Sequence, residues 1–369
     1  MTTANLLYTD TEDALRDTVR RLFAERCKPE AVVTLYDRPD ADFTGVWKTL
    51  AAELGLAGLL VPESLGGAGA STREAAVVME EIGRAVAPVP FLSSAVLATV
   101  ALLKTGETQT LRSLADGSTT GSLTIPLSTP PGAYTATVRV GASGLIGRVS
   151  SVADANTSDV LVVPVSGPDG LELHTVARAA AGMKVTPALP LDMTRPIADV
   201  EFSAVASTRV DNGAAEDAVA EALLCGAVLL ASEQVGVAQW CLETTLGYVK
   251  ERKQFGRAIA EFQGLQFMLA DMAMKIEAAR QLTYAAAAKS ERAMHGDRAA
   301  DLTFISSACK CFASDVAMDV TTDAVQLLGG YGYVSDYPVE RMMRDAKITQ
   351  IYEGTNQIQR MVMARQILK

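Results

Sequence analysis

Glu353 is the residue of this sequence with the clearest capacity to move a proton. It is the only charged residue in the run 351–359, and it stands between Tyr352 and Gly354. A carboxylate in apolar surroundings loses hydration, which raises its pKa and makes it a candidate general base. The glycine beside it has no side chain to keep a ligand away. The alternative is an exposed helical carboxylate without function, because most surface carboxylates have none.

A second group of side chains could bind a phosphate and a planar ring. Arg252, Gln254 and Phe255 stand close together just before Gly256. They offer a guanidinium that can donate two parallel hydrogen bonds, an amide and an aromatic face beside a tight turn. Such a set of groups suits a ligand with a pyrophosphate and an adenine. An arginine at a helix end can instead bind the exposed carbonyls there. We favour ligand binding.

A glycine-rich run follows the last long helical segment. Residues 326–333 read Gln-Leu-Leu-Gly-Gly-Tyr-Gly-Tyr, with Gln326 ahead of Gly329 and Gly330. Glycine after a helix is most often a cap, and a glycine run alone is weak evidence for a ligand. Because the run does not follow a strand, a Rossmann dinucleotide site is a poor interpretation.

Composition limits the class of protein. The 369 residues are 49% apolar and 21% charged, as in a globular protein of two or three domains. The formal net charge of −10 argues against a nucleic-acid surface. We expect no secretion signal and no membrane span, because neither apolar pattern is present. Five cysteines without paired spacing indicate reduced thiols and a cytoplasmic location.

The hydrophobic periodicity predicts a mostly α protein in three domains. Residues 1–118 form an N-terminal α-helical domain, in which Asp42 and Ser71 cap helices. Residues 119–212 form a small middle β-domain of about seven strands. Residues 213–369 form a C-terminal bundle of four long helices. Its three longest helical segments are predicted at residues 218–250, 262–294 and 299–328.

This order of helices, strands and long helices resembles the acyl-CoA dehydrogenase family over most of the chain. The Tyr-Glu-Gly-Thr run at Glu353, the Arg-x-Gln-Phe-Gly run at Arg252 and the Gln-x-x-Gly-Gly-x-Gly run at Gln326 carry the resemblance, in the right order. It implies FAD-dependent α,β-dehydrogenation of an acyl-CoA thioester. Glu353 would take the α-proton, and the hydride would pass to flavin N5. An electron-transfer flavoprotein is the implied electron acceptor.

The resemblance also implies the residues that bind FAD. Some would contact an FAD held mainly by a neighbouring subunit, and others follow the base directly. The implied residues are Arg252, Gln254, Phe255, Gln326, Gly329, Gly330, Thr355 and Gln357.

Two family segments that surround the flavin are missing. Where a Thr-Glu-x-x-x-Gly-Ser-Asp-like segment is expected, residues 123–130 read Leu-Thr-Ile-Pro-Leu-Ser-Thr-Pro. Where a Lys-x-Trp-Ile-Thr-like strand is expected, residues 144–150 contain no tryptophan. Both tryptophans, Trp47 and Trp240, fall in predicted helices. The chain thus keeps the groups that serve a neighbour's FAD and lacks those that hold its own.

Neighbouring charged residues offer no second base. Some family members carry the base on the first long C-terminal helix, but residues 224–227 of this chain include no carboxylate. Glu233 is better interpreted as a surface or interface residue. Arg341 and Arg344 precede Glu353 on a predicted helix and are interpreted as solvated charges.

Three functions remain. The chain resembles subunits of actinobacterial α2β2 acyl-CoA dehydrogenases of sterol and lipid catabolism, which hold one flavin per heterodimer. It is therefore expected to be a catalytic subunit of a homo- or heterotetramer with Glu353 as the base. Alternatively, it is a non-catalytic or half-site partner that completes the FAD site of a paralogous subunit. A non-enzymatic binding protein on the same scaffold ranks last.

Overall fold

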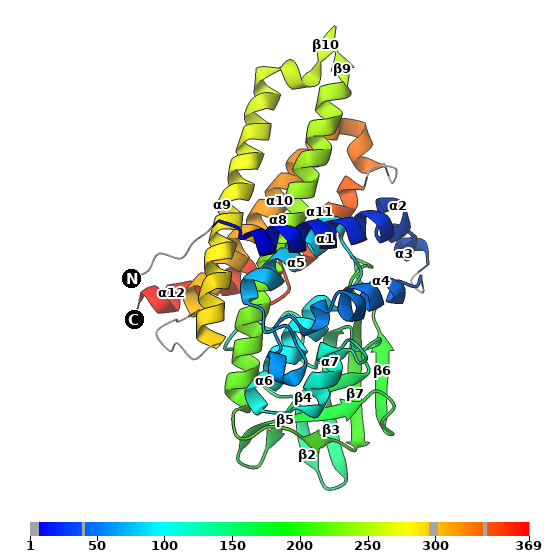
Figure 1. Ribbon diagram of the computed structural model, residues 1–369, viewed down its shortest axis with the longest axis vertical. Helices are drawn as coiled ribbons and strands as arrows, with labels where there is room; N and C mark the ends of the chain where they lie inside the picture. The colour runs from blue at the N-terminus through cyan, green and yellow to red at the C-terminus, as the bar shows by residue number, and fades with distance from the viewer. Residues whose placement is uncertain (1–6, 39–40, 295–301, 335–337, 369) are drawn as a thin grey trace.

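The computed structural model describes residues 7–38, 41–294, 302–334 and 338–368. A mixed β-sheet lies at one end of the molecule beside the N-terminal helices, and the long C-terminal helices extend away from it (Figure 1). Most of the regular structure is helical, so the mostly α prediction is confirmed. The expected start of a helix at residue 299 lies outside the described residues. The divisions at residues 118 and 212 stay predictions, although the strands of the sheet all fall between Gly121 and Arg209.

The N-terminal helices begin where side chains satisfy their first amides. Helix α1 (Asp10–Arg26) starts at a capping box of Thr9 and Glu12, and α5 (Thr72–Ala85) at one of Ser71 and Glu74. The predicted cap at Ser71 is confirmed. The predicted cap at Asp42 is wrong, because Phe43 is the N-cap of α4 (Thr44–Lys48), although Asp42 accepts from the backbone N–H of Thr44. The remaining helical segments are α2 (Pro29–Val32), α3 (Thr34–Asp37), α4 (Thr44–Lys48), η1 (Thr49–Glu53), η2 (Leu56–Gly58), η3 (Glu63–Leu65), η4 (Phe91–Ala98), α6 (Thr99–Thr105) and α7 (Gln109–Ala115).

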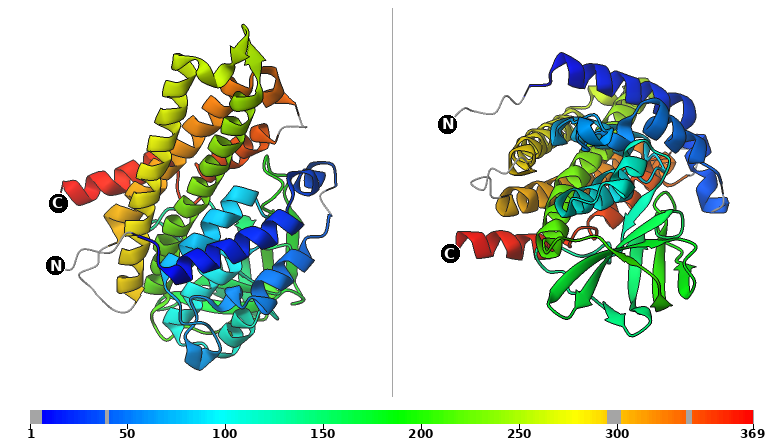
Figure 2. Two further views of the ribbon diagram at one scale, coloured as in Figure 1. Left: turned by 45° about the horizontal axis from the view of Figure 1, so that its top comes forward. Right: turned by 60° about the horizontal axis from the view of Figure 1, so that its bottom comes forward.

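The middle segment forms one sheet in the order β6-β7-β3-β2-β4-β5-β8, with β1 parallel to β4. Alternate side chains of β3, β4 and β7 form an apolar core separate from that of the helices. Figure 2 shows the sheet curving beside the N-terminal helices. Its strands are β1 (Gly121–Leu123), β2 (Val138–Gly141), β3 (Gly144–Ala153), β4 (Val160–Gly167), β5 (Gly170–Ala177), β6 (Met183–Pro187), β7 (Ile197–Val205) and β8 (Thr208–Arg209).

Three long helices dominate the C-terminal part: α8 (Ala215–Glu251), α9 (Gln263–Met294) and α10 (Thr303–Leu328). The 37 residues of α8 extend about 55 Å. Its length and composition would allow it to cross a membrane, but 83% of its most apolar window is buried inside the protein, as in a core helix. Strands β9 (Lys253–Gln254) and β10 (Arg257–Ala258) and η5 (Ile259–Glu261) join α8 to α9 at the far tip of the molecule (Figure 1).

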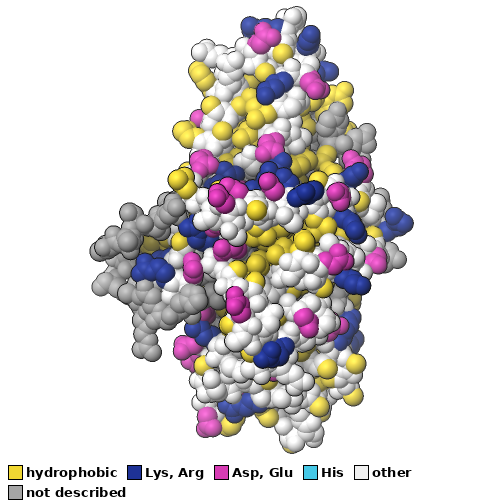
Figure 3. All heavy atoms as spheres, viewed as in Figure 1, with side chains coloured by type: hydrophobic (Ala, Val, Ile, Leu, Met, Phe, Trp, Pro, Cys, Tyr) yellow, Lys and Arg dark blue, Asp and Glu magenta, His cyan; other side chains and the backbone are white. Residues whose placement is uncertain are grey.

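Two shorter helices complete the C-terminal bundle beside α10. They are α11 (Val339–Thr349) and α12 (Asn356–Ile367), which both pack against α10, and η6 (Gly329–Tyr333) precedes them. The loop between them carries Glu353. On the face drawn in Figure 3, charged side chains of both signs mix across the middle, where α1 crosses the bundle. Apolar side chains gather above them, over the ends of α8 and α9.

Helices α5 and α8 cross with their backbones in direct contact. A Cβ on Gly83 would lie 1.9 Å from the carbonyl oxygen of Glu233, and a Cβ on Gly236 would lie 1.9 Å from that of Glu80. Backbone atoms cannot move aside as a flexible side chain can. The two glycines therefore fix how closely the N-terminal helices approach α8.

Gly236→Ala is expected to lower the free energy of unfolding by about 1–3 kcal/mol, because the added methyl group forces α5 and α8 apart. Gly247→Ala is the matched control on the same helix, since a Cβ there meets no atom within 4 Å. That control should be neutral or stabilising by up to about 1 kcal/mol through helix propensity. Urea unfolding measures both, and equal midpoints for the two variants would contradict the close crossing.

Candidate active site

Glu353 lies in a tight, closed loop between α11 and α12. Its φ of 53° and the φ of 88° at Gly354 are both in the left-handed region. The backbone N–H of Glu353 donates to the carbonyl of Leu127 at 2.8 Å. A Cβ on Gly354 would lie 2.5 Å from Cβ of Pro130, so only glycine fits here. The loop thus packs directly on the segment that follows β1.

The carboxyl group of Glu353 is enclosed, with 1% of the residue exposed. It lies against Gly226 of α8, where a Cβ would be 3.4 Å from Oε1 of Glu353 and 2.6 Å from Cδ2 of Leu97. Within the described part of the chain, Oε2 has no hydrogen-bond partner. Burial raises the pKa of Glu353 to about 8, against the opposing charges of Lys310 and Arg195. Such a pKa suits a general base near neutral pH.

Lys310 of α10 holds this loop in place, a role that we did not predict. The residue is 0% exposed. Its Nζ donates to the carbonyls of Gln350 at 2.9 Å and Gly354 at 2.7 Å, and lies 3.3 Å from Oδ1 of Asn356. Burial lowers the pKa of Lys310 to about 8, although Glu353 opposes this. A lysine between two cysteines in an apolar helical segment was the available sequence signal.

A buried ion pair lies behind Tyr352. The guanidinium of Arg195, from the segment before β7, bonds to Glu233 of α8, and its Cζ lies 5.4 Å from the centre of the Tyr352 ring. Glu233 is buried and the side chain of Arg195 is 13% exposed, so the interpretation of Glu233 as a surface or interface residue is wrong. Arg341 is also buried, and interpreting it as a solvated charge is wrong as well. Periodicity alone gave no sign that the β-domain covers this side of α8.

The pKa of Glu353 predicts a specific pH dependence of stability. Between about pH 4.5 and 8 the folded state keeps a proton that the unfolded carboxyl has lost, so stability falls as the pH rises. The fall over this range is about 5 kcal/mol, since each pH unit changes the free energy of unfolding by about 1.4 kcal/mol. Glu353→Gln should remove this contribution to the dependence of the free energy of unfolding on pH. Parallel slopes for the two proteins in urea unfolding across this range would contradict the buried acid.

A separate groove brings together four of the predicted ligand residues. Arg252, Gln254, Gly329 and Gly330 line a cavity of about 650 Å³ where α8 and α10 end. A Cβ on either glycine would meet no atom of the chain within 4 Å, so their backbone faces open space. Tyr331 also lines the groove, with the Arg252 guanidinium 5.9 Å from its ring centre. The sequence indicated the first four residues and missed the tyrosine.

The other predicted ligand residues lie outside this groove lining. Phe255 is 93% exposed at the tip of the β9–β10 turn, and Gln326 is exposed on the last turn of α10. Thr355 caps α12 by accepting from the N–H of Ile358, and Gln357 is exposed on that helix. The ligand roles of these residues stay predictions.

The groove and the Glu353 loop are two distinct sites. Lys310 contacts the loop and Leu328 lines the groove. These two residues of α10 are about 27 Å apart at the helical rise of about 1.5 Å per residue. The groove faces outward at the free end of the bundle, so a ligand there is available to a neighbouring chain.

Comparison with known proteins identifies the family. The N-terminal domain of acyl-CoA dehydrogenases matches residues 9–117, and the C-terminal domain matches residues 217–368. A probable acyl-CoA dehydrogenase, fadE25 of Mycobacterium leprae, is 65% identical over 140 residues, which are 38% of this chain and 35% of that protein. The matched part of the chain thus spans about a third of the length of this curated relative.

Solved structures of other proteins share the fold of this chain over nearly its whole length. Butyryl-CoA dehydrogenase from Megasphaera elsdenii has 27% identity and a TM-score of 0.84, covering 99% of this chain and 100% of that one. A variant of the Tcur3481-Tcur3483 steroid ACAD has 26% identity and a TM-score of 0.84, covering 97% of this chain and 98% of the other. The two matched domains, the helix–sheet–helix order and the motifs at Arg252, Gly329 and Glu353 lead to one conclusion. This chain belongs to the acyl-CoA dehydrogenase family.

Proposed function

We propose that this chain is a subunit of a heteromeric, FAD-dependent acyl-CoA dehydrogenase and completes the FAD site of a paralogous subunit. The observation that carries the proposal is the contrast between its two sites. The groove at the ends of α8 and α10 is open and lined by Arg252, Gly329 and Gly330, whereas the Glu353 loop is closed by direct backbone contacts.

The groove fits a dinucleotide phosphate. Arg252 supplies a forked cationic donor, and Gly329 and Gly330 allow the backbone to approach a diphosphate closely. The ring of Tyr331 offers a flat apolar face next to them. FAD bound there would be held by these residues together with the partner subunit. The cofactor supplies the hydride acceptor for oxidation of the acyl-CoA.

The Glu353 side of this chain does not fit a flavin of its own. The N–H of Leu127 donates to Ser151 of β3 at 2.9 Å, and its carbonyl accepts from Glu353. Strand β3, the segment after β1 and the Glu353 loop are thus joined without a gap, and β3 contains no aromatic residue. The backbone N–H of Glu353 already donates to the carbonyl of Leu127, so it is not free to polarise a thioester carbonyl.

The stoichiometry of the assembly tests the proposal. The chain is co-expressed with a paralogous acyl-CoA dehydrogenase subunit, and native mass spectrometry counts the flavins. We expect an α2β2 complex with one FAD per pair of unlike chains, which oxidises an acyl-CoA and reduces an electron-transfer flavoprotein. Two FAD per pair, or a homotetramer that is fully loaded with flavin, would overturn it.

A second candidate is that Glu353 itself takes the α-proton of an acyl-CoA bound to this chain. The pKa of about 8 and the unpartnered Oε2 among the described residues favour it. Glu353→Gln separates the two candidates in the assembled complex. The partner-subunit function predicts an unchanged turnover number, within about twofold. A base at Glu353 predicts a loss of about 10²–10⁴-fold.

A further inference from the structure

A cavity of about 320 Å³ lies apart from both sites, between α1, α5, α8 and α11. Its size falls at the lower end of the range for small-molecule sites, about 300–1,000 Å³. Much of its wall is apolar and comes from elements far apart in the sequence. These wall residues include Phe23, Cys27, Val86, Trp240 and Met342.

The charged residues of the wall are mostly basic. Arg20, Lys28, Arg84 and Arg341 line the cavity, against the single carboxylate of Glu81. An excess of guanidinium and ammonium groups around an apolar space favours an anion with an apolar body.

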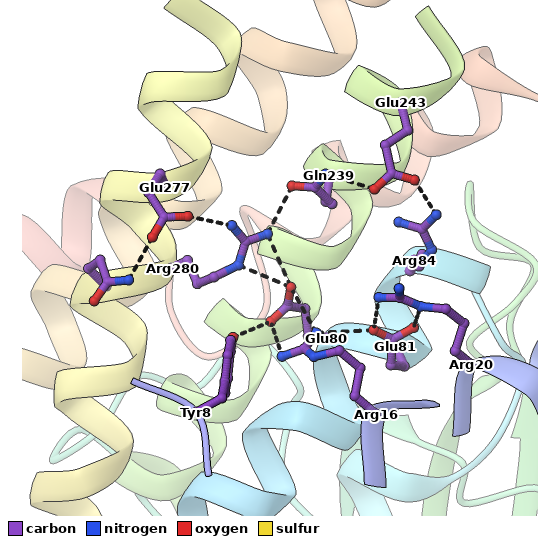
Figure 4. Close-up of polar contacts among 11 residues, drawn as sticks. Tyr8, Arg16, Arg20, Glu80, Glu81, Arg84, Gln239, Glu243, Glu277 and Arg280 are labelled. Carbon is purple, nitrogen blue, oxygen red and sulfur yellow. Dashed lines mark hydrogen bonds and ion pairs between the residues drawn. The ribbon is translucent and has the colours of Figure 1, made fainter. Parts of the chain in front are cut away.

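Two of these arginines are already neutralised. Arg20 forms two hydrogen bonds to Glu81, at 2.9 and 2.7 Å, and Arg84 pairs with Glu243 of α8. Figure 4 shows both pairs within a larger network that ties α1 and α5 to α8 and α9. Of this network, Arg20, Glu81 and Arg84 line the cavity. The charge of Glu81 is balanced by its ion pairs with Arg16 and Arg20.

Arg341 is different because it is buried without an ion pair. It is 8% exposed, and its Nη1 donates to the carbonyl of Pro29 at 2.9 Å. Among the described residues it forms no ion pair within 4.0 Å, and its Nε has no hydrogen-bond partner. Burial lowers the pKa of Arg341, and the more distant acidic groups only oppose this in part. These groups are Tyr36, Glu340, Glu30 and Asp192. A buried cation without a counter-ion is costly, so an anion beside it would be stabilising.

We propose that this cavity binds a small amphipathic monocarboxylate. The carboxylate pairs with Arg341, and the apolar body packs against Phe23, Val86 and Trp240. The cavity is separate from the flavin groove and from Glu353. A test of ligand binding in this cavity is therefore also independent of the proposed function.

Octanoate is the probe, and the fluorescence of Trp240 reports its binding. The chain has only two tryptophans, and Trp47 is not part of this wall. We expect a saturable change in emission with octanoate, confirmed by calorimetry. Octan-1-ol, which lacks the charge, should bind at least about tenfold more weakly, as expected for losing a charge-assisted hydrogen bond. Acetate, which lacks the apolar body, should give no saturable signal.

Two variants and one control locate the site. Arg341→Met should weaken octanoate binding by about tenfold or more. Ala24→Phe fills the cavity without changing its charge and should abolish binding, which keeps the test valid if Arg341→Met fails to fold. Lys347→Met, an exposed basic residue on the same helix, should bind like the unmodified protein. The proposal is overturned if octanoate does not bind saturably, if octan-1-ol binds equally well, or if Ala24→Phe binds normally.

Discussion

Replacing Lys310 by methionine is expected to lower the free energy of unfolding by about 3–5 kcal/mol. The amine donates to the carbonyls of Gln350 and Gly354 and lies within reach of Oδ1 of Asn356. Without it, these acceptors lose a donor inside the protein, where water cannot replace it. The left-handed turn at Glu353 and Gly354 would also lose the hydrogen bond that joins it to Lys310 of α10.

Urea unfolding of Lys310→Met beside Lys275→Met measures this effect. Lys275 forms an exposed ion pair with Asp319 on the neighbouring helix, so its loss should cost less than about 1 kcal/mol. A double-mutant cycle of Lys310→Met with Glu353→Gln should show coupling of at least about 0.5 kcal/mol, as for residues in one network. If the two lysine variants were equally stable, the loop would not depend on Lys310.

Substitutions in the groove are expected to remove flavin from the assembled complex. Arg252→Met deletes a charge-assisted contact and should weaken FAD binding by about tenfold to a hundredfold. A Cβ at Gly330 meets no atom of the chain within 4 Å, so we expect the side chain of Gly330→Val to project into the groove and block the ligand without disturbing the fold. Its loss of flavin should be at least as large.

The flavin absorbance of each purified complex, relative to protein, measures this loss. Arg360→Met is the control for charge, because Arg360 is exposed, pairs with Asp315 and lies away from the groove. It should keep its full flavin content. Unchanged flavin in Gly330→Val would show that the groove does not bind the cofactor.

Local patterns predicted the elements because local physics determines them. The cap at Ser71 and the apolar stripes of the long helices can be identified within a few residues of sequence. The groove was also predictable, since Arg252 and Gln254 follow one helix end and Gly329 and Gly330 follow another. Only the packing of those two ends against each other required the structure.

The closure of the Glu353 loop was not predictable from the sequence. It depends on pairs that are distant in the chain, namely Leu127 with Glu353, Pro130 with Gly354 and Lys310 with Gln350. None of these pairs has a periodicity or spacing that marks it. A signature of ten residues therefore predicted a carboxylate that has lost its hydration, and Glu353 is buried. Long-range packing determines whether a substrate can reach it.

The flavin content of the isolated chain tests the central claim most directly. The chain is purified alone, incubated with excess FAD, separated from free cofactor, and its visible absorption spectrum is recorded beside that of the complex with its paralogous subunit. We predict no flavin bands for the chain alone and one FAD per pair of chains in the complex. A stoichiometric flavin spectrum from the isolated chain would contradict the account.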